Sequence, residues 1–191
     1  MKVVAFNGST RKDGNTAILL NKVLDEIRTE GIETELYQLA GKKIQGCIAC
    51  YKCMKNKDKR CAVDNDIVNE CIAKMIEADG ILLGSPTYFA DVSAATRALI
   101  ERTGYVARAN DYMFKRKVGA GVVAVRRGGA IHAFNSLNLF FFYQQMINPG
   151  SSYWAFAIGR EPGEVLNDAE GIQTMKTLGQ NLAWLLKKVR A

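Results

Sequence analysis

Short apolar runs recur along the chain and are separated by longer stretches with a helical period. Continuous apolar runs at 2–6, 80–88, 118–125 and 153–159 are typical of strands. The segment 32–39 alternates apolar and polar residues, which also indicates a strand. The pattern therefore predicts five strands along the chain.

Helical patterns fill most of the intervals between these strands. The stretch after the first strand has its apolar residues at helical spacing, at Ile18, Leu19, Val23, Leu24 and Ile27. Asp64 is the predicted N-cap of a later helix, whose apolar face holds Ile67, Val68, Cys71, Ile72, Met75 and Ile76. A last helix is expected from about Asp168 to the C-terminus.

The alternation of strands and helices implies a parallel sheet with helices on both faces. Five strands fit the flavodoxin-like order 2-1-3-4-5, an α/β three-layer sandwich in which ligands bind where the first and third strands diverge. At 191 residues, with no internal repeat or linker, the chain is predicted to form one domain, 1–191.

Composition and charge narrow the class of partner. No apolar run is long enough to span a bilayer, and the apolar N-terminal stretch is too short for a signal peptide, so we expect a cytoplasmic protein without a membrane partner. The net charge of +7 suits either nucleic acid or acidic small molecules such as phosphorylated cofactors. Because the basic residues are scattered and no basic stripe alternates with aromatics, we expect no nucleic acid.

Three loops of unusual composition follow the first, third and fourth strands, at 7–16, 85–91 and 126–129. In the predicted sheet these loops share one crevice. The first, "GSTRKDGNT", combines small residues, hydroxyl groups and an arginine directly before a helix, which suits an anion. It has neither the Lys-Ser/Thr ending of a nucleotide P-loop nor a G-x-G-x-x-G spacing. It therefore indicates either a monophosphate site without magnesium or a simple turn with a helix cap.

The other two loops have features that a planar, anionic ligand would use. Tyr88 and Phe89 stand beside a turn and can border a planar ring system or belong to the core. The adjacent glycines of "VRRGGA" allow the backbone to approach a ligand closely, while the arginines can face an anion or solvent. Convergence of all three loops on one crevice favours a bound cofactor.

The segments "FNGSTRKDGNT" and "SPTYFADVSAATRALIER" resemble the NAD(P)H-dependent FMN reductase family. The resemblance covers nearly the whole chain and implies an FMN cofactor, with NAD(P)H as a possible substrate. It implies that the phosphate is contacted by Ser9, Arg11, Asn15 and Thr16. It also implies that the isoalloxazine is bordered by Pro86, Thr87, Tyr88 and Phe89. In the third loop, the cofactor-binding residues that it implies are Gly128 and Gly129.

Four of the five cysteines form the pattern C-x2-C-x2-C-x7-C inside an insert at about 44–63: Cys47, Cys50, Cys53 and Cys61. The compact triple spacing is typical of the run that holds a [4Fe–4S] cluster in ferredoxins. A four-cysteine zinc site, a C-x-x-C redox pair and four free thiols are the alternatives. Cys71 lies instead on an apolar helix face and is predicted to be a core residue.

Within the FMN reductase family, such a cysteine run resembles the iron–sulfur flavoproteins, which implies one FMN and one [4Fe–4S] cluster per chain. The function expected is electron transfer between the two cofactors, with a small molecule or a ferredoxin-like protein as redox partner. The alternatives are a cluster-free NAD(P)H-dependent FMN or quinone reductase, and a redox or metal sensor. His132 is the single histidine, which argues against Ser-His-Asp catalysis and against a histidine-rich metal site. It is predicted to be a polar residue on a partly exposed helix.

The segment "FNSLNLFFFYQQM" is apolar on more than one face, more than one helix packed on a sheet requires. The protein is therefore expected to form a homodimer or homotetramer.

Overall fold

The computed structural model describes residues 1–189 and contains one five-stranded parallel sheet in the order β2-β1-β3-β4-β5. This is the predicted flavodoxin-like order. The strands are β1 (Lys2–Asn7), β2 (Glu33–Gln38), β3 (Gly80–Pro86), β4 (Val118–Val125) and β5 (Phe156–Ile158).

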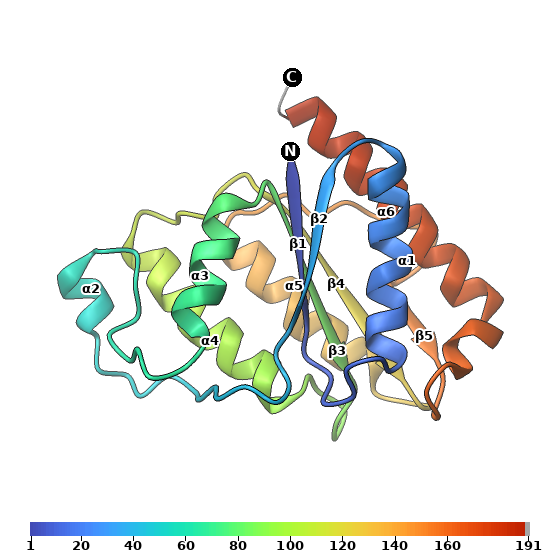
Figure 1. Cartoon of the computed structure of the whole chain (residues 1–191), viewed down its shortest axis with the longest axis horizontal. Coiled ribbons are helices and arrows are strands. Elements are labelled where there is room, and N and C mark those ends of the chain that lie inside the picture. Colours follow the sequence, from blue (N-terminus) through green and yellow to red (C-terminus); the bar gives the residue numbers. More distant parts are fainter. Residues whose placement is uncertain (190–191) are drawn as a thin grey trace.

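Helices cover both faces of the sheet (Figure 1): α1 and α6 lie on one face, and α3, α4 and α5 on the other. The helices are α1 (Asn15–Thr29), α2 (Lys52–Asn56), α3 (Val68–Glu77), α4 (Ala94–Ala109), α5 (Ala130–Tyr143), a 3-10 turn η1 (Glu164–Asn167) and α6 (Ala169–Val189). Among residues 1–189, no helix combines the length and the apolar character needed to cross a bilayer.

The period of two along a strand sends alternate side chains of β1 to the two helical layers. Val3 and Ala5 pack in the core beneath α1 and α6, whereas Val4 and Phe6 pack toward α3, α4 and α5. Cys71 of α3 belongs to the second core and is fully buried, and this burial raises the pKa of its thiol to about 12. Its predicted role as a core residue is confirmed.

Three predicted element boundaries were wrong. The α3 helix begins at Val68, not after Asp64, because Asp66 turns inward to pair with Arg102 and its Oδ1 accepts from the Val68 N–H at 3.2 Å. Strand β5 has only three residues, since Tyr153 and Trp154 pack against each other outside the sheet with ring centroids 4.5 Å apart. The cysteine segment, predicted as a loop, contains the short helix α2.

The remaining predictions for single elements agree with the structure. The last helix begins at Ala169, next to the predicted Asp168, and its predicted end at 190–191 lies outside the described residues. His132 stands on α5 with 71% of its side chain exposed.

Candidate functional site

A cavity of about 280 Å³ opens at the carboxyl ends of β1, β3 and β4, along the lower edge of the sheet in Figure 1. Parallel-sheet proteins bind ligands at this edge. The lining residues are Ser9, Arg11, Asn15, Thr16, Pro86, Thr87, Tyr88, Ala124, Arg126, Gly159 and Arg160. Seven of the ten cofactor-binding residues predicted from the sequence are among them, and Phe89, Gly128 and Gly129 are not.

The loop after β1 is held in shape by side chains before its helix begins. The Asn7 side-chain oxygen accepts from the Ser9 N–H at 3.1 Å, and the Ser9 hydroxyl accepts from the Arg11 N–H at 3.1 Å. Gln38 at the end of β2 donates to the Ser9 carbonyl at 2.7 Å. Gly8 has no room for a side chain, because a Cβ there would lie 1.8 Å from the Thr96 hydroxyl oxygen. The contacts with Asn7, Gln38 and Thr96 thus fix the conformation of this loop.

Polar groups facing this cavity lack partners within the protein. The N-cap residue of α1 is Gly14, and no side chain caps the helix, so the first N–H groups of α1 are available to an anion. The hydroxyl oxygens of Thr16 and Thr87 are buried and have no hydrogen-bond partner in the described residues. Because buried polar groups are normally paired, these groups fit a ligand with phosphate and hydroxyl oxygens.

The loop after β3 forms a tight turn in which Tyr88 and Asp91 exchange backbone hydrogen bonds of 2.8 and 3.0 Å. Phe89 and Ala90 at its tip have positive φ angles of 47° and 62°, and Phe89 is fully exposed. The Tyr88 hydroxyl lies 3.2 Å from that of Thr10. This contact joins Tyr88, which lines the cavity, to the loop after β1.

Gly129 packs under this turn as the N-cap of α5, with φ of 87°. A Cβ on Gly129 would lie 2.8 Å from the Ala90 Cα atom, whereas a Cβ on Gly128 would meet nothing within 4 Å. Gly129 therefore supports the aromatic loop from outside the cavity, and Gly128 is free of such contacts.

Two further residues, Gly159 and Arg160, follow β5 and line the same cavity, although neither was predicted as a site residue. The rule that placed the other loops, that parallel strands end at one edge, applies equally to the end of the fifth strand. Arg126, left open between an anion and solvent, lines the cavity, so it is available to an anion.

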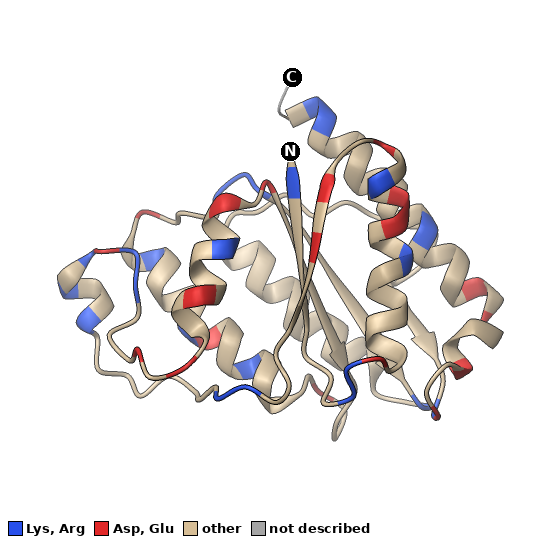
Figure 2. Cartoon of the chain, viewed as in Figure 1, with Lys and Arg blue, Asp and Glu red and all other residues tan. Residues whose placement is uncertain are grey.

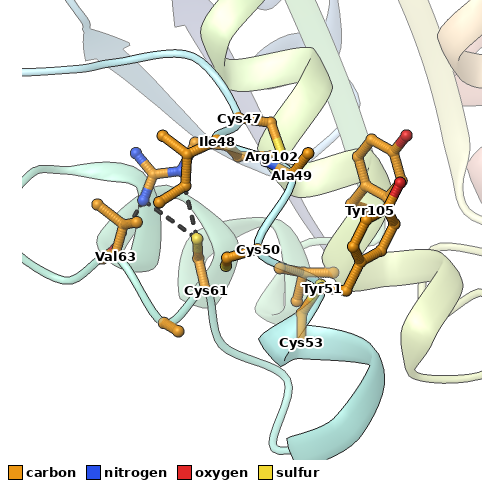
Figure 3. Close-up of a pocket in the computed structure, with 12 residues that line it drawn as sticks. Cys47, Ile48, Ala49, Cys50, Tyr51, Cys53, Cys61, Val63, Arg102 and Tyr105 are labelled. Atoms are coloured by element: carbon orange, nitrogen blue, oxygen red, sulfur yellow. Dashed lines mark hydrogen bonds between the residues drawn. The ribbon is translucent and has the colours of Figure 1, made fainter.

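A second cavity, small and largely enclosed, is lined by all four cysteines of the run (Figure 3). Their thiols are free, and apolar groups of Ile48, Ala49, Val63 and Val106 complete the wall. Burial raises the pKa of the Cys53 thiol. In the described part of the chain, no three Cys, His, Asp or Glu side chains are placed to hold a metal ion. The fold nonetheless brings the four sulfur-bearing residues around one space.

The backbone around this cavity adopts conformations that are unusual outside glycine. Ala49, Tyr51, Lys57 and Lys59 have φ angles between 51° and 60°. The turn at Ala49 directs its N–H to the Cys47 sulfur at 3.4 Å. Strained backbone of this kind is concentrated at ligand sites, where the surrounding structure imposes it.

Helix α4 forms the floor of the cysteine cavity and fixes both ends of the run. Glu101 accepts from the Cys47 N–H at 3.2 Å, and Arg102 donates to the Cys61 sulfur. These two residues lie in the middle of α4, whose N-cap Ser93 has a hydroxyl that donates to the Gly8 carbonyl in the loop after β1 at 2.7 Å. Nine residues of helix, roughly 14 Å at 1.5 Å per residue, therefore connect the two sites.

This sheet order, with a cavity at the switch point and an aromatic loop beside it, defines a flavodoxin-like protein, a class that binds its ligands at this edge of the sheet. A crystal structure of a WrbA-like flavodoxin of Agrobacterium tumefaciens superposes with a TM-score of 0.65 at 14% identity, over 98% of this chain and 97% of that one. The sequence model described as NADPH-dependent FMN reductase matches residues 1–161. The chain belongs to that family, an FMN-binding family of flavoprotein oxidoreductases.

Curated relatives share a narrower name. An iron–sulfur flavoprotein of Methanocaldococcus jannaschii is 36% identical over the full length of both chains. An iron–sulfur flavoprotein of Archaeoglobus fulgidus is 34% identical over 92% of this chain and 86% of its own.

Proposed function

We propose that the protein transfers electrons between an FMN in the sheet-edge cavity and a [4Fe–4S] cluster held by Cys47, Cys50, Cys53 and Cys61. When bound, FMN exchanges electron pairs or single electrons, and the cluster exchanges single electrons. The observation that carries the proposal is that all four cysteines line one cavity, which packs against α4, a helix whose N-cap Ser93 contacts the loop after β1.

Different residues of the chain would bind the phosphate and the isoalloxazine of FMN. The free N–H groups at the start of α1, that of Asn15 among them, would hold the phosphate with Ser9, Arg11 and Thr16. Arg126 and Arg160 add positive charge at the same cavity. Pro86, Thr87 and Tyr88 would border the isoalloxazine, with the exposed Phe89 at its outer edge. NAD(P)H, another small molecule or a ferredoxin-like protein would exchange electrons with the site.

Three features support the cluster. Each cysteine of a cubane binds a different iron, so the sulfurs need not converge as closely as they do around a single ion. The cavity is mostly apolar, which suits the sulfur-rich surface of a cluster. Lys and Arg residues gather on α2 and the loop after it (Figure 2), where they offset the negative charge of thiolate ligands.

The surface and the thiols support further parts of the proposal. Leu139, Phe142 and Tyr143 of α5 are all more than half exposed and form an apolar surface that a second copy of the chain would cover in a homodimer or homotetramer. Five free cysteines suit the reducing cytoplasm.

Anaerobic reconstitution with FMN, ferrous iron and sulfide tests the proposal. We expect two resolved flavin absorption bands, a broad brown shoulder, and about four iron atoms per chain. Flavin bands without iron would leave a cluster-free NAD(P)H-dependent reductase, the activity that the family description favours. Stable uptake of zinc in place of iron would indicate a structural metal site.

A further inference from the structure

Arg102, in the middle of α4, is the largest of the fully buried side chains of the described chain, with 1% of its surface exposed. Its Nε and Nη2 atoms both donate to the Cys61 sulfur, each at 3.3 Å (Figure 3). The planar guanidinium group thus donates a pair of hydrogen bonds, a fork of two N–H donors, to one sulfur atom.

The remaining donors of Arg102 are also used. Nη1 donates to the Gln45 carbonyl at 3.3 Å and to Asp66, and Nη2 donates to the Val63 carbonyl at 2.6 Å. The Asp66 side chain is fully buried and supplies the counter-charge. All five N–H groups of the guanidinium therefore have acceptors, and two of the five are directed to sulfur.

This use of donors is costly if Cys61 is a neutral thiol, because a thiol is a weak acceptor. A thiolate that binds iron carries negative charge, and charge-assisted hydrogen bonds are the stronger kind. The arrangement fits a thiolate at this position.

Cys61 also differs from the other three cysteines in how its backbone is held. Its N–H donates to the Asn69 side-chain oxygen at 2.8 Å, and its carbonyl accepts from the Asn69 amide at 2.9 Å. Asn69 of α3 fixes the backbone and Arg102 of α4 fixes the sulfur. The position of Cys61 in the cysteine cavity is therefore fixed by contacts within the protein that need no bound ligand.

We propose that Arg102 is a positioning residue that orients the Cys61 thiolate and raises the reduction potential of the cluster. The inference rests on the cluster of the proposed function. Hydrogen bonds to ligand sulfurs and nearby positive charge favour the reduced cluster, which carries one more electron. Loss of the fork should shift the one-electron equilibrium toward the oxidised cluster by about tenfold or more, which corresponds to about 59 mV per factor of ten.

Three variants separate this role from a merely structural one. Arg102→Met combined with Asp66→Asn removes the fork without leaving a buried carboxylate unpaired. Arg102→Lys keeps the charge and loses the paired donors. Arg108→Met, six positions further along α4 and exposed, removes an equal charge that does not touch a cysteine and serves as the control.

The midpoint potential is measured by anaerobic titration with dithionite, followed by electron paramagnetic resonance of the reduced cluster, after iron and FMN contents are determined. We expect the potential to fall most in the double variant, less in Arg102→Lys, and to stay unchanged in Arg108→Met. If the double variant holds FMN but no iron, the orientation of Cys61 is supported and Arg102→Lys reports the potential. Normal iron content with wild-type potentials in the double variant and in Arg102→Lys would overturn the inference. Failure of the wild-type protein to bind iron would instead overturn the proposed function.

Discussion

The side-chain oxygen of Asn15 accepts a hydrogen bond from the backbone N–H of Gly163 at 2.8 Å, across 148 positions of sequence. The Asn15 amide group donates in turn to the Glu161 carbonyl at 3.0 Å. Nearby, Arg11 donates to the Arg160 carbonyl at 3.3 Å. The loop after β5 is thus tied to the loop after β1, which brings Arg160 to the cavity at the sheet edge. Asn15 joins the two loops with both ends of its amide.

The phosphate assignment predicts that Arg11→Ala weakens FMN binding with the fold intact. Loss of a charge-assisted contact costs about 1.5–3 kcal/mol, which is roughly tenfold or more in affinity. Fluorescence titration of apoprotein with FMN measures it. Arg127→Ala is the control, because Arg127 is exposed and does not line the cavity. Equal FMN affinity in Arg11→Ala and wild type would remove Arg11 from the site.

The unpartnered hydroxyl of Thr16 predicts opposite effects on stability and binding. Thr16→Val should stabilise the apoprotein by about 1 kcal/mol, because a buried polar atom without a partner is removed. The same change should weaken FMN binding by about tenfold. Thr103→Val is the matched control, since the buried Thr103 hydroxyl donates to the Leu99 carbonyl at 2.7 Å. It should lower stability and leave FMN affinity unchanged. Urea unfolding and FMN titration distinguish the two patterns.

The two glycines of the third loop are predicted to respond differently to alanine. Gly129→Ala should destabilise the protein by roughly 1–3 kcal/mol, since φ is positive and the new Cβ meets the Ala90 backbone. Gly128→Ala has open space and should lie within about 0.5 kcal/mol of wild type. Thermal unfolding of both apoproteins tests this. Similar melting temperatures would mean that the aromatic loop does not depend on Gly129.

Serine at Cys47, Cys50, Cys53 or Cys61 should sharply lower the iron content after anaerobic reconstitution, while FMN stays bound by its separate loops. Cys71→Ser should keep iron and lose about 1–3 kcal/mol of stability, because it buries a hydroxyl in the core. Iron retained in all four single variants, or lost in Cys71→Ser, would contradict the ligand set.

The exposed apolar face of α5 predicts that light scattering at micromolar concentration gives at least a dimer mass. Phe142→Glu should shift the protein toward monomer, because 82% of this side chain is exposed and a second copy would bury it. Trp184→Glu changes an aromatic residue that is 61% exposed on α6, in the opposite layer, and should leave the mass unchanged. A monomeric wild-type protein would contradict the expected assembly.

Features that depend on neighbours along the chain could be predicted from the amino-acid sequence alone. Period-two and helical spacing predicted the presence of five strands and the core position of Cys71, because burial of an apolar face leaves few alternatives. The alternation of strands with helices predicted the sheet order. The spacing of Cys47, Cys50 and Cys53 and the composition of the loops after the strands indicated both sites. Parallel strands that end at one edge brought these loops together without any knowledge of side-chain packing.

The long-range partners that complete each site could not be predicted, because they depend on how helices and loops pack together. In the sequence, Arg102 is an ordinary charged residue of a helix, yet packing of α4 under the cysteine loop buries it against Asp66 and Cys61, 36 and 41 positions away. Because Asp66 pairs with Arg102, α3 begins at Val68 and not at the predicted Asp64. The hydrogen bonds of Asn15 to the loop after β5 bring Arg160 to the sheet-edge cavity, and Phe89 is fully exposed although Thr87, two positions before it, is only partly exposed. Such contacts are set by how whole helices and loops pack, and a buried charge becomes stable only where packing supplies its counter-charge.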